Sequence, residues 1–251
     1  MRITTLVPDL VSEILQVIWP ARCAACDVTI AEAATFCDGC ATGLNLLLGA
    51  CGGCALPQVA PTTAAFRCRT CHRVPFPFAS GGAVFEYGEA IARAIVRMKH
   101  GGRRYLGKRL GRLLAPALGD LLARTALGAD DVVVPVPLHP TKLRDRGFNQ
   151  ASEMARAALR ILRRRGPVPR YDRNLLLRTR RTRELGHAGP AARLAEVAGA
   201  FAVADPARVR GRRIVVIDDV FTTGATFSEC ADALRAAGAI RVHVLALARA
   251  V

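Results

Sequence analysis

The stretch that decides the fold is residues 214–226, which read IVVIDDVFTTGAT. Its run of branched apolar residues predicts a buried strand over 213–217, and two carboxylates, Asp218 and Asp219, follow directly. A loop of small residues then leads into a helix predicted over 226–237. Strand, loop and helix in this order are typical of a βαβ unit.

The loop after the two carboxylates suits a phosphate group. Its backbone N–H groups and hydroxyls would face the anion, and the positive end of the helix dipole would add to the attraction. Gly224 would let the ligand approach closely, and the two carboxylates would hold ribose hydroxyls directly or through Mg²⁺. We call this segment the phosphate loop; its residues are Thr222, Thr223, Gly224, Ala225 and Thr226. The alternative is an ordinary strand–turn–helix with solvated carboxylates, but a Walker or dinucleotide motif is excluded.

The C-terminal two thirds of the chain alternate strand and helix patterns. Strands are predicted at 83–87, 132–136, 213–217 and 241–248, and helices at 89–99, 106–126, 149–165 and 226–237. Because strands alternate with helices, we expect an α/β fold with a mostly parallel sheet covered on both faces.

Eight of the nine cysteines form four CxxC pairs: Cys23 and Cys26, Cys37 and Cys40, Cys51 and Cys54, Cys68 and Cys71. Two such pairs complete a tetrahedral four-cysteine zinc site, which would be structural because four thiolates leave no position for substrate. Sequential pairing gives one zinc to the first four cysteines and another to the last four. The spacing also leaves open a crossed pairing or a single zinc.

Other residues around the cysteines have competing interpretations. A redox role for the CxxC pairs is the main alternative to metal binding. His72 could replace Cys71 as a ligand, and Cys230 is expected in the core. Gly39, Gly52 and Gly53 lie in or near turns whose amides can donate to the sulfurs.

The charge is unevenly distributed. Residues 1–80 are formally neutral, so the net charge of +16 belongs to residues 81–251. A basic domain attracts nucleotide or nucleic-acid phosphates; the alternative is a compositional bias toward arginine. Only 5% of the residues are aromatic, so nucleic-acid binding would be electrostatic and salt-dependent. The arginines that would supply it are Arg103, Arg104, Arg160, Arg163, Arg164, Arg165, Arg180, Arg181 and Arg183.

No apolar stretch is long enough to span a membrane, and Asp9 and Glu13 interrupt the start of the chain. We therefore expect a cytoplasmic protein, where reduced thiols favour metal binding. Apolar residues at helical spacing predict an amphipathic helix over 8–18, which leaves open a peripheral contact with the inner face of the membrane.

Several motifs together resemble one known family. The carboxylate pair and phosphate loop resemble the signature of type I phosphoribosyltransferases that binds 5-phosphoribosyl-1-pyrophosphate (PRPP). Residues 132–150 (VVVPVPLHPTKLRDRGFNQ), 97–107 (RMKHGGRRYLG) and 238–249 (GAIRVHVLALAR), with the cysteine pattern, resemble the ComF (GntX-like) family. The resemblance implies a type I phosphoribosyltransferase-like parallel sheet preceded by a zinc-ribbon module. The implied boundaries are 1–20 for an N-terminal amphipathic helix, 21–78 for the double zinc ribbon and 79–251 for the phosphoribosyltransferase-like domain.

The resemblance also implies residue roles. The backbone at Pro137, Leu138 and His139 would contact pyrophosphate. Lys142, Arg144 and Arg146 would neutralise it, although each could instead be a solvated surface charge. Arg146, Asp218 and Asp219 are the residues we expect to act in catalysis.

Residues 178–201 correspond to the mobile hood of the family. Arg178, Thr182, Arg193 and Phe201 match its pattern. Leu185 and Glu196 replace a glutamine and an asparagine, so the hood has lost two polar groups that would serve transfer. His187 is an alternative base there.

The resemblance implies a protein that binds PRPP and Mg²⁺ and supports the uptake or handling of single-stranded DNA in natural competence. The alternative is a non-catalytic PRPP sensor or DNA-binding scaffold for a DNA-import complex. Implied partners are PRPP or another phosphoribosyl ligand, single-stranded DNA, and a competence helicase or DNA-processing protein.

Overall fold

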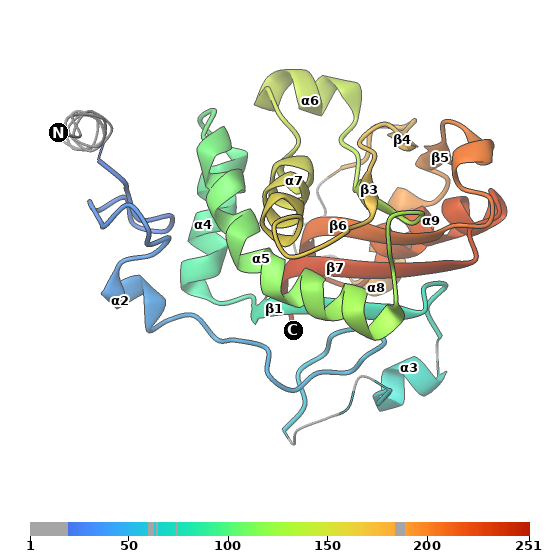
Figure 1. Ribbon diagram of the computed structural model, residues 1–251, viewed down its shortest axis with the longest axis horizontal. Helices are drawn as coiled ribbons and strands as arrows, with labels where there is room; N and C mark the ends of the chain where they lie inside the picture. The colour runs from blue at the N-terminus through green and yellow to red at the C-terminus, as the bar shows by residue number, and fades with distance from the viewer. Residues whose placement is uncertain (1–19, 60–62, 64, 74, 184–188) are drawn as a thin grey trace, which may run out of the picture.

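The computed structural model describes residues 20–59, 63, 65–73, 75–183 and 189–251 (Figure 1). The helix predicted over 8–18 lies outside these residues. The centre is a five-stranded sheet in which every neighbouring pair is parallel. Its strands, in spatial order, are β1 (Ser80–Glu86), β7 (Arg241–Arg249), β6 (Arg213–Phe221), β2 (Val132–Pro135) and β3 (Arg170–Tyr171). The predicted parallel α/β fold is confirmed.

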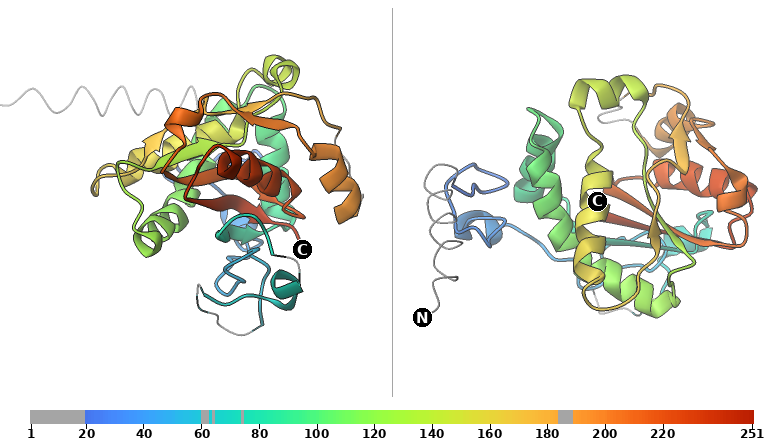
Figure 2. Two further views of the ribbon diagram at one scale, coloured as in Figure 1. Left: turned by 90° about the vertical axis from the view of Figure 1, so that its right-hand side faces the viewer. Right: turned by 45° about the horizontal axis from the view of Figure 1, so that its top comes forward.

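Helices cover both faces of this sheet. One face carries α4 (Glu89–Lys99), α5 (Arg104–Thr125) and α7 (Gln150–Leu162). Of these, α7 stands in front of the strands in the right-hand view of Figure 2. The other face carries α9 (Ala225–Ala236). Smaller elements lie around the rim: α6 (Pro140–Arg146), α8 (Pro190–Val197), the 3₁₀ turn η1 (Pro206–Arg208) and the antiparallel pair β4 (Leu176–Arg178) and β5 (Phe201–Val203).

The strands alternate between two cores. In β6, Val215 and Ile217 pack with α4, α5 and α7, whereas Ile214 and Val216 pack on the α9 side. A strand buried on both faces must be apolar at successive positions. This is why the motif read as a continuous apolar run.

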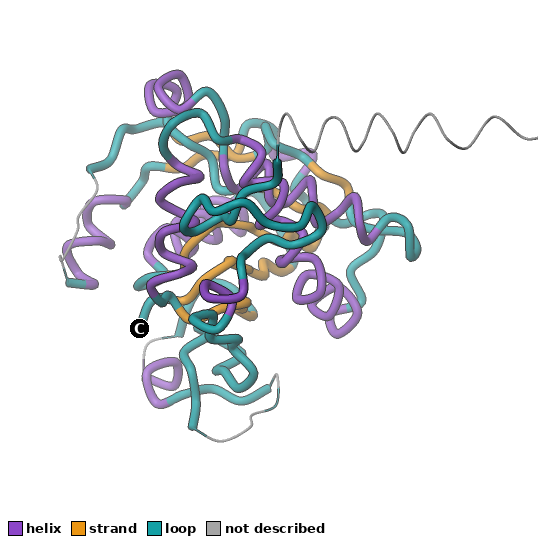
Figure 3. Tube along the Cα trace, turned by 90° about the vertical axis from the view of Figure 1, so that its left-hand side faces the viewer, coloured by secondary structure: helices purple, strands orange, loops and turns teal. Residues whose placement is uncertain are grey.

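The cysteine-rich segments are mostly loop, as Figure 3 shows, with two short helices, α2 (Asp38–Ala41) and α3 (Arg69–Arg73). They pack on different cores. Cys23 and Cys40 belong to the core that contains α4 and α5, and Cys51, Cys54 and Cys68 belong to the core on the α9 side. The two halves of the cysteine pattern therefore reach different parts of the sheet domain.

The element boundaries differ from the prediction in two places that matter for function. β6 extends to Phe221 and pairs Asp218 with Ala246 of β7, so the two carboxylates lie within the strand and not after it. The expected end at 217 was wrong because β7 is long enough to continue the ladder. In addition, residues 140–146, for which no helix was predicted, form α6.

None of the helices in the described ranges is long and apolar enough to cross a membrane.

Candidate functional site

A cleft of about 800 Å³ opens at the carboxyl ends of β2 and β6. The chain continues from β2 to β3 on one side, and from β6 to β7 on the opposite side. Connections that diverge between neighbouring parallel strands leave a crevice at that point of the sheet, where α/β proteins commonly bind ligands. The helix α6 and residues 178–183 at the start of the hood form walls of this cleft.

The cleft has an excess of positive charge. Its carboxylates are Asp145, Asp218 and Asp219, and its cations are Lys99, Lys142, Arg146, Arg178, Arg181 and Arg183. A hollow of about 420 Å³ adjoins it and is lined by Thr222, Thr223 and Ala225 of the phosphate loop. Both share Asp219, Arg146 and Thr226, so they form one continuous site, and cations line both parts of it.

The two carboxylates at the centre differ in their surroundings. Asp219 is 4% exposed, and its Oδ2 lies 2.7 Å from the Nζ of Lys99, the last residue of α4. Burial, followed by the negative charge of Asp219, raises the pKa of Asp218 to about 8. Burial lowers the pKa of Lys99, but the charge and hydrogen bond of Asp219 outweigh it and leave that pKa above its ordinary value. Lys99 therefore balances the charge of this pair.

The phosphate loop requires a glycine for reasons within the protein. Gly224 has φ of 88° and is the residue before the first turn of α9. A Cβ at this position would lie 2.6 Å from Cε1 of Phe76 and 3.1 Å from Cε2 of Phe221. The expected reason, room for a ligand, is therefore incomplete: the rings behind the loop also exclude a side chain.

The segment RGFNQ positions the cationic end of the cleft. Gly147, at φ of 78°, ends α6, and the side chain of Asn149 begins α7 by accepting from Ser152 N at 3.0 Å. The Asn149 amide also donates to Val136 O at 2.9 Å, which fixes α7 to the end of β2. Gln150 is buried, and its Oε1 accepts from Nη1 of Arg146 at 2.5 Å. The motif therefore orients Arg146 into the cleft.

Only some of the other residues predicted to contact pyrophosphate lie at the cleft. Leu138, His139 and Lys142 line the cleft, but Arg144 is exposed on α6 and is not among the lining residues described. Pro137 has no N–H, so it cannot donate from its backbone as expected. The Nδ1 of His139 lies 2.8 Å from the Thr141 hydroxyl, where it caps α6.

The arginines predicted to bind nucleic acid do not form one patch. Arg181 and Arg183 line the cleft, whereas Arg180 donates to the carbonyls of Glu196 and Ala198. The run 163–165 follows the far end of α7, where Arg165 borders a separate groove.

The hood departure at Glu196 has a structural role. Its Oε1 accepts from the backbone N–H of Arg183 at 2.6 Å, which joins α8 to the loop after β4. Arg193 of α8 donates to the Thr222 hydroxyl at 3.4 Å, so the hood also reaches the phosphate loop. Leu185 and His187 lie outside the described residues.

Sequence reasoning gave no role to Lys99 or Gln150, although both lie in segments that carry the family resemblance. A signal was present in each case. Lys99 ends a predicted helix directly before His-Gly-Gly, and Gln150 is the last residue of RGFNQ, the motif that Arg146 opens.

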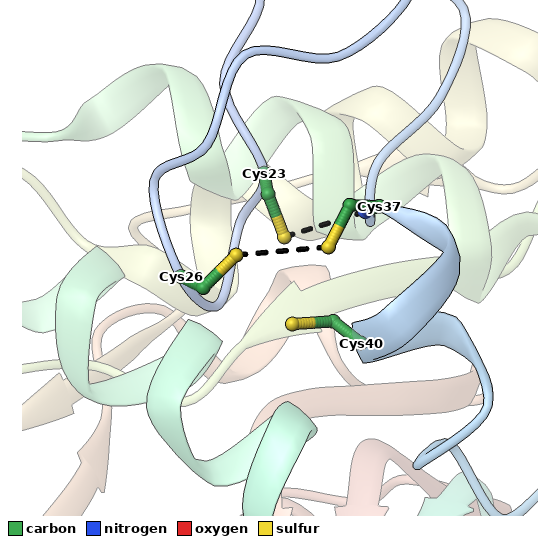
Figure 4. Close-up of side chains that lie close together, drawn as sticks. All are labelled: Cys23, Cys26, Cys37 and Cys40. Carbon is green, nitrogen blue, oxygen red and sulfur yellow. Dashed lines mark hydrogen bonds between the residues drawn. The ribbon is translucent and has the colours of Figure 1, made fainter.

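The eight cysteines form two clusters in sequence order, and in each the candidate ligand atoms lie within 4.8 Å of one another. The first cluster is Cys23, Cys26, Cys37 and Cys40, whose sulfurs point toward a common centre in Figure 4. Its Cys26 and Cys37 sulfurs are 3.6 Å apart. Two thiolates on one tetrahedral zinc lie about 3.8 Å apart. The cluster therefore fits a structural zinc, and the grouping is sequential and not crossed.

The second cluster, Cys51, Cys54, Cys68 and Cys71, is buried throughout. Its sulfurs are 3.6 Å apart in two pairs. The N–H groups of Gly53 and Cys68 donate to the Cys51 sulfur at 3.4 and 3.1 Å. Burial raises the pKa of Cys51, but these and other backbone N–H groups outweigh it and lower that pKa to about 7, which favours the thiolate that zinc binds.

The parallel sheet, the acidic strand end with its phosphate loop, and the cation-lined cleft define a phosphoribosyltransferase-like protein that also carries two four-cysteine clusters. The chain is 30% identical to DNA utilization protein YhgH of Salmonella typhimurium over 233 residues, 92% of this chain and 97% of the relative. It is 30% identical to competence protein F of Haemophilus influenzae over 165 residues, 65% of this chain and 70% of the relative. The chain belongs to the ComF family, as its motifs predicted.

Two further comparisons, with family models and with solved structures, do not extend this assignment. No family model matches the chain. A solved structure titled as the allosteric regulatory enzyme of purine biosynthesis is 28% identical, covering 55% of this chain and 24% of that chain, with a TM-score of 0.32. The Bacillus subtilis glutamine PRPP amidotransferase is 27% identical, covering 61% of this chain and 27% of that chain, with the same TM-score.

Proposed function

We propose that the cleft binds PRPP together with Mg²⁺. The observation that carries this proposal is the continuity of the site: the phosphate loop, the carboxylate pair and the cationic helix α6 line two hollows that share Arg146, Asp219 and Thr226. PRPP carries groups that suit these three parts: a 5-phosphate, a ribose diol and a 1-pyrophosphate.

Each part of the site has a matching part of the ligand. The amides and hydroxyls of residues 222–226 suit the 5-phosphate at the start of α9. Lys142, Arg146 and the amides of Leu138 and His139 suit the pyrophosphate. Asp218 and Asp219 suit the ribose hydroxyls, and Arg146 with these two carboxylates remains our proposal for the residues that would act in catalysis.

The donor set also fits Mg²⁺, because carboxylate oxygens at the mouth of a phosphate site are the ligands this ion prefers. When bound, the ion would neutralise the pyrophosphate. Lys99 now balances the charge of Asp219 at 2.7 Å, so it would have to share that carboxylate with the ion.

We further propose a role in the uptake or use of DNA, because the relatives are named for DNA utilization and competence. Single-stranded DNA and a DNA-processing protein are the partners we infer. We also retain the division into a helix over 1–20, a zinc-ribbon segment over 21–78 and a phosphoribosyltransferase-like domain over 79–251.

A non-catalytic PRPP sensor or scaffold is the second candidate. It is favoured by Glu196, because this residue replaces the asparagine expected to serve transfer and its carboxylate accepts from the N–H of Arg183. In that case PRPP would bind without turnover and would report nucleotide supply to a DNA-handling complex.

Calorimetric titration with PRPP, with and without Mg²⁺, tests the site. We expect binding that requires Mg²⁺, is lost in Asp218→Asn/Asp219→Asn and is weakened about tenfold or more in Arg146→Gln, since a charge-assisted contact to phosphate is removed. Arg144→Gln is the matched control, because this exposed arginine is on the same helix outside the cleft. Equal affinities for the wild type and the carboxylate variant would contradict the proposal.

A further inference from the structure

Arg249 joins the second cysteine cluster to the phosphate loop. It is the last residue of β7 and is 8% exposed. Its Nε donates to the carbonyl of Cys54 at 2.8 Å, while its Nη1 donates to the carbonyls of Phe221 and Thr222 at 3.0 and 2.5 Å. One rigid guanidinium therefore holds a zinc-ligand residue and the start of the phosphate loop at a fixed separation.

The charge of Arg249 suits this position. Burial lowers the pKa of the Arg249 guanidinium, and the negative charge of Cys54, Cys68 and Cys71 acts against that shift. Four thiolates around Zn²⁺ carry a net charge of −2, and a buried cation is stable only where such a charge and several acceptors compensate its lost hydration. Metal in the second cluster would therefore hold Arg249 in place.

Aromatic rings form a second connection between the same two regions. Phe76 follows the second cluster by five residues, and its ring would contact a Cβ at Gly224 at 2.6 Å. This ring stacks on Phe78 with centroids 4.8 Å apart. The ring of Phe221 lies 4.8 Å below the Arg249 guanidinium carbon. The phosphate loop thus packs on aromatic rings, one of which follows the second cluster closely in the chain.

The first cluster has arginines of its own, but they reach elsewhere. Arg109, 9% exposed, donates to the carbonyl of Arg22 at 2.6 Å and to that of Ala34. Arg97 donates to the carbonyls of Cys23 and Ala24 at 2.8 and 3.1 Å. Among the described residues, none of these hydrogen bonds reaches the phosphate loop.

We propose that Arg249 is a positioning residue through which the second cysteine cluster sets the conformation of the phosphate loop. Its effect on ligand affinity rests on the proposed function, whereas its effect on the loop does not. Loss of metal from the second cluster would displace the guanidinium, free the carbonyls of Phe221 and Thr222, and weaken phosphate binding at a distance from the ligand.

The test compares Arg249→Met with Arg109→Met, because each removes one buried guanidinium that donates to the carbonyls of a cysteine loop. Hydrogen exchange gives a readout without ligand: the N–H groups of Ser228 and Ala250 donate to the carbonyls of Gly224 and Phe221 at 2.8 and 2.9 Å. We expect Arg249→Met to raise exchange at these two amides and to weaken PRPP binding about tenfold or more. Arg109→Met should leave both unchanged.

Zinc content and exchange elsewhere separate positioning from general destabilisation. Protected amides of α7 should exchange at the wild-type rate in a folded Arg249→Met, and Arg249→Lys should restore part of the affinity, since one ammonium can serve only some of the acceptors. If Arg249→Met does not fold, Arg249→Lys carries the same comparison. Wild-type exchange at Ser228 and Ala250 in these variants would overturn the proposal. If the wild type does not bind PRPP, the proposed function fails and the exchange measurement still decides the role of Arg249.

Discussion

The two cysteine clusters have the same four ligands and the same CxxC spacing, yet their surroundings differ. In the first cluster Cys26 is exposed and Cys37 is half-buried, and the loop is attached to α4 and α5 through Arg97 and Arg109. In the second cluster all four cysteines are buried, and the loop is attached to the phosphate loop through Arg249. Identical zinc chemistry is therefore placed to support different structures.

This difference shows what a structural metal can contribute to a site it does not enter. The first cluster stabilises the end of a helix pair, and α4 carries Lys99 at its last position. The second cluster is joined to the phosphate loop itself, through Arg249. We therefore expect the loss of either cluster to lower the stability of the fold by a similar amount. Only the loss of the second cluster should strongly weaken ligand binding.

The largest effect is expected from removing one cluster at a time. Cys51→Ser/Cys54→Ser should lose the second zinc, lower the melting temperature strongly and abolish PRPP binding, because the phosphate loop loses its support. Zinc content, thermal unfolding and calorimetry of the same samples measure these outcomes.

Cys23→Ser/Cys26→Ser is the matched variant in the first cluster. It should also lose a zinc and melt earlier, but the protein that remains folded should bind PRPP within about threefold of the wild type, which is less than 1 kcal/mol. An equal loss of affinity in both variants would show that the clusters act only through global stability.

A smaller effect is the pH dependence of stability. It must be separated from the loss of zinc, because acid also releases zinc from thiolates. Burial, followed by the charges of Arg241, Arg124 and Arg213, lowers the pKa of His243 to about 4. Its Nδ1 lies 2.7 Å from the hydroxyl of Ser80. An unfolded histidine protonates near pH 6.5, so between pH 6.5 and 4 the unfolded chain binds a proton that the folded protein does not.

His243 alone should therefore lower the stability of the folded protein, on the order of 3 kcal/mol, as the pH falls through this window. Asp218 acts in the opposite direction, because its pKa is raised to about 8 and the folded state takes up its proton first. The difference between the wild type and His243→Asn isolates the histidine, and denaturant unfolding from pH 7 to 4 measures it. Parallel pH curves for the two proteins would show that His243 does not titrate as described.

Much of this site could be predicted from the sequence because local patterns encode it. Each of three local patterns predicts a local structure. They are the branched apolar run before Asp218, the small residues after Asp219 and the doubled CxxC spacing. The order of elements was enough to predict the parallel sheet.

What could not be predicted depends on contacts between distant segments. The cysteine spacing did not reveal that Cys54 and Thr222 share one arginine, because their partner Arg249 is almost two hundred residues from Cys54 in the chain. The extension of β6 through Asp219 depends on the length of β7. The ion pair of Lys99 with Asp219 depends on the packing of α4 against the sheet.

The smallest effect expected comes from one glycine in each cluster, at the same position of its CxxC pair. A Cβ at Gly53 would lie 2.9 Å from the sulfur of Cys71 and 2.9 Å from Cδ of Arg67. Gly53→Ala must therefore displace a zinc ligand, and we expect a destabilisation of about 1–3 kcal/mol with weaker retention of the second zinc. Denaturant unfolding and competition with a chelator measure the two effects.

Gly39→Ala is the control in the first cluster, since a Cβ there meets nothing within 4 Å. Gly39 lies within α2, where alanine is favoured over glycine by about 0.5–1 kcal/mol, so this variant should be as stable as the wild type or slightly more stable. The same substitution would thus destabilise the second cluster, which is buried throughout, and spare the first. A loss of stability in Gly39→Ala equal to that in Gly53→Ala would mean that the first cluster is packed as tightly as the second, and the contrast between them would fail.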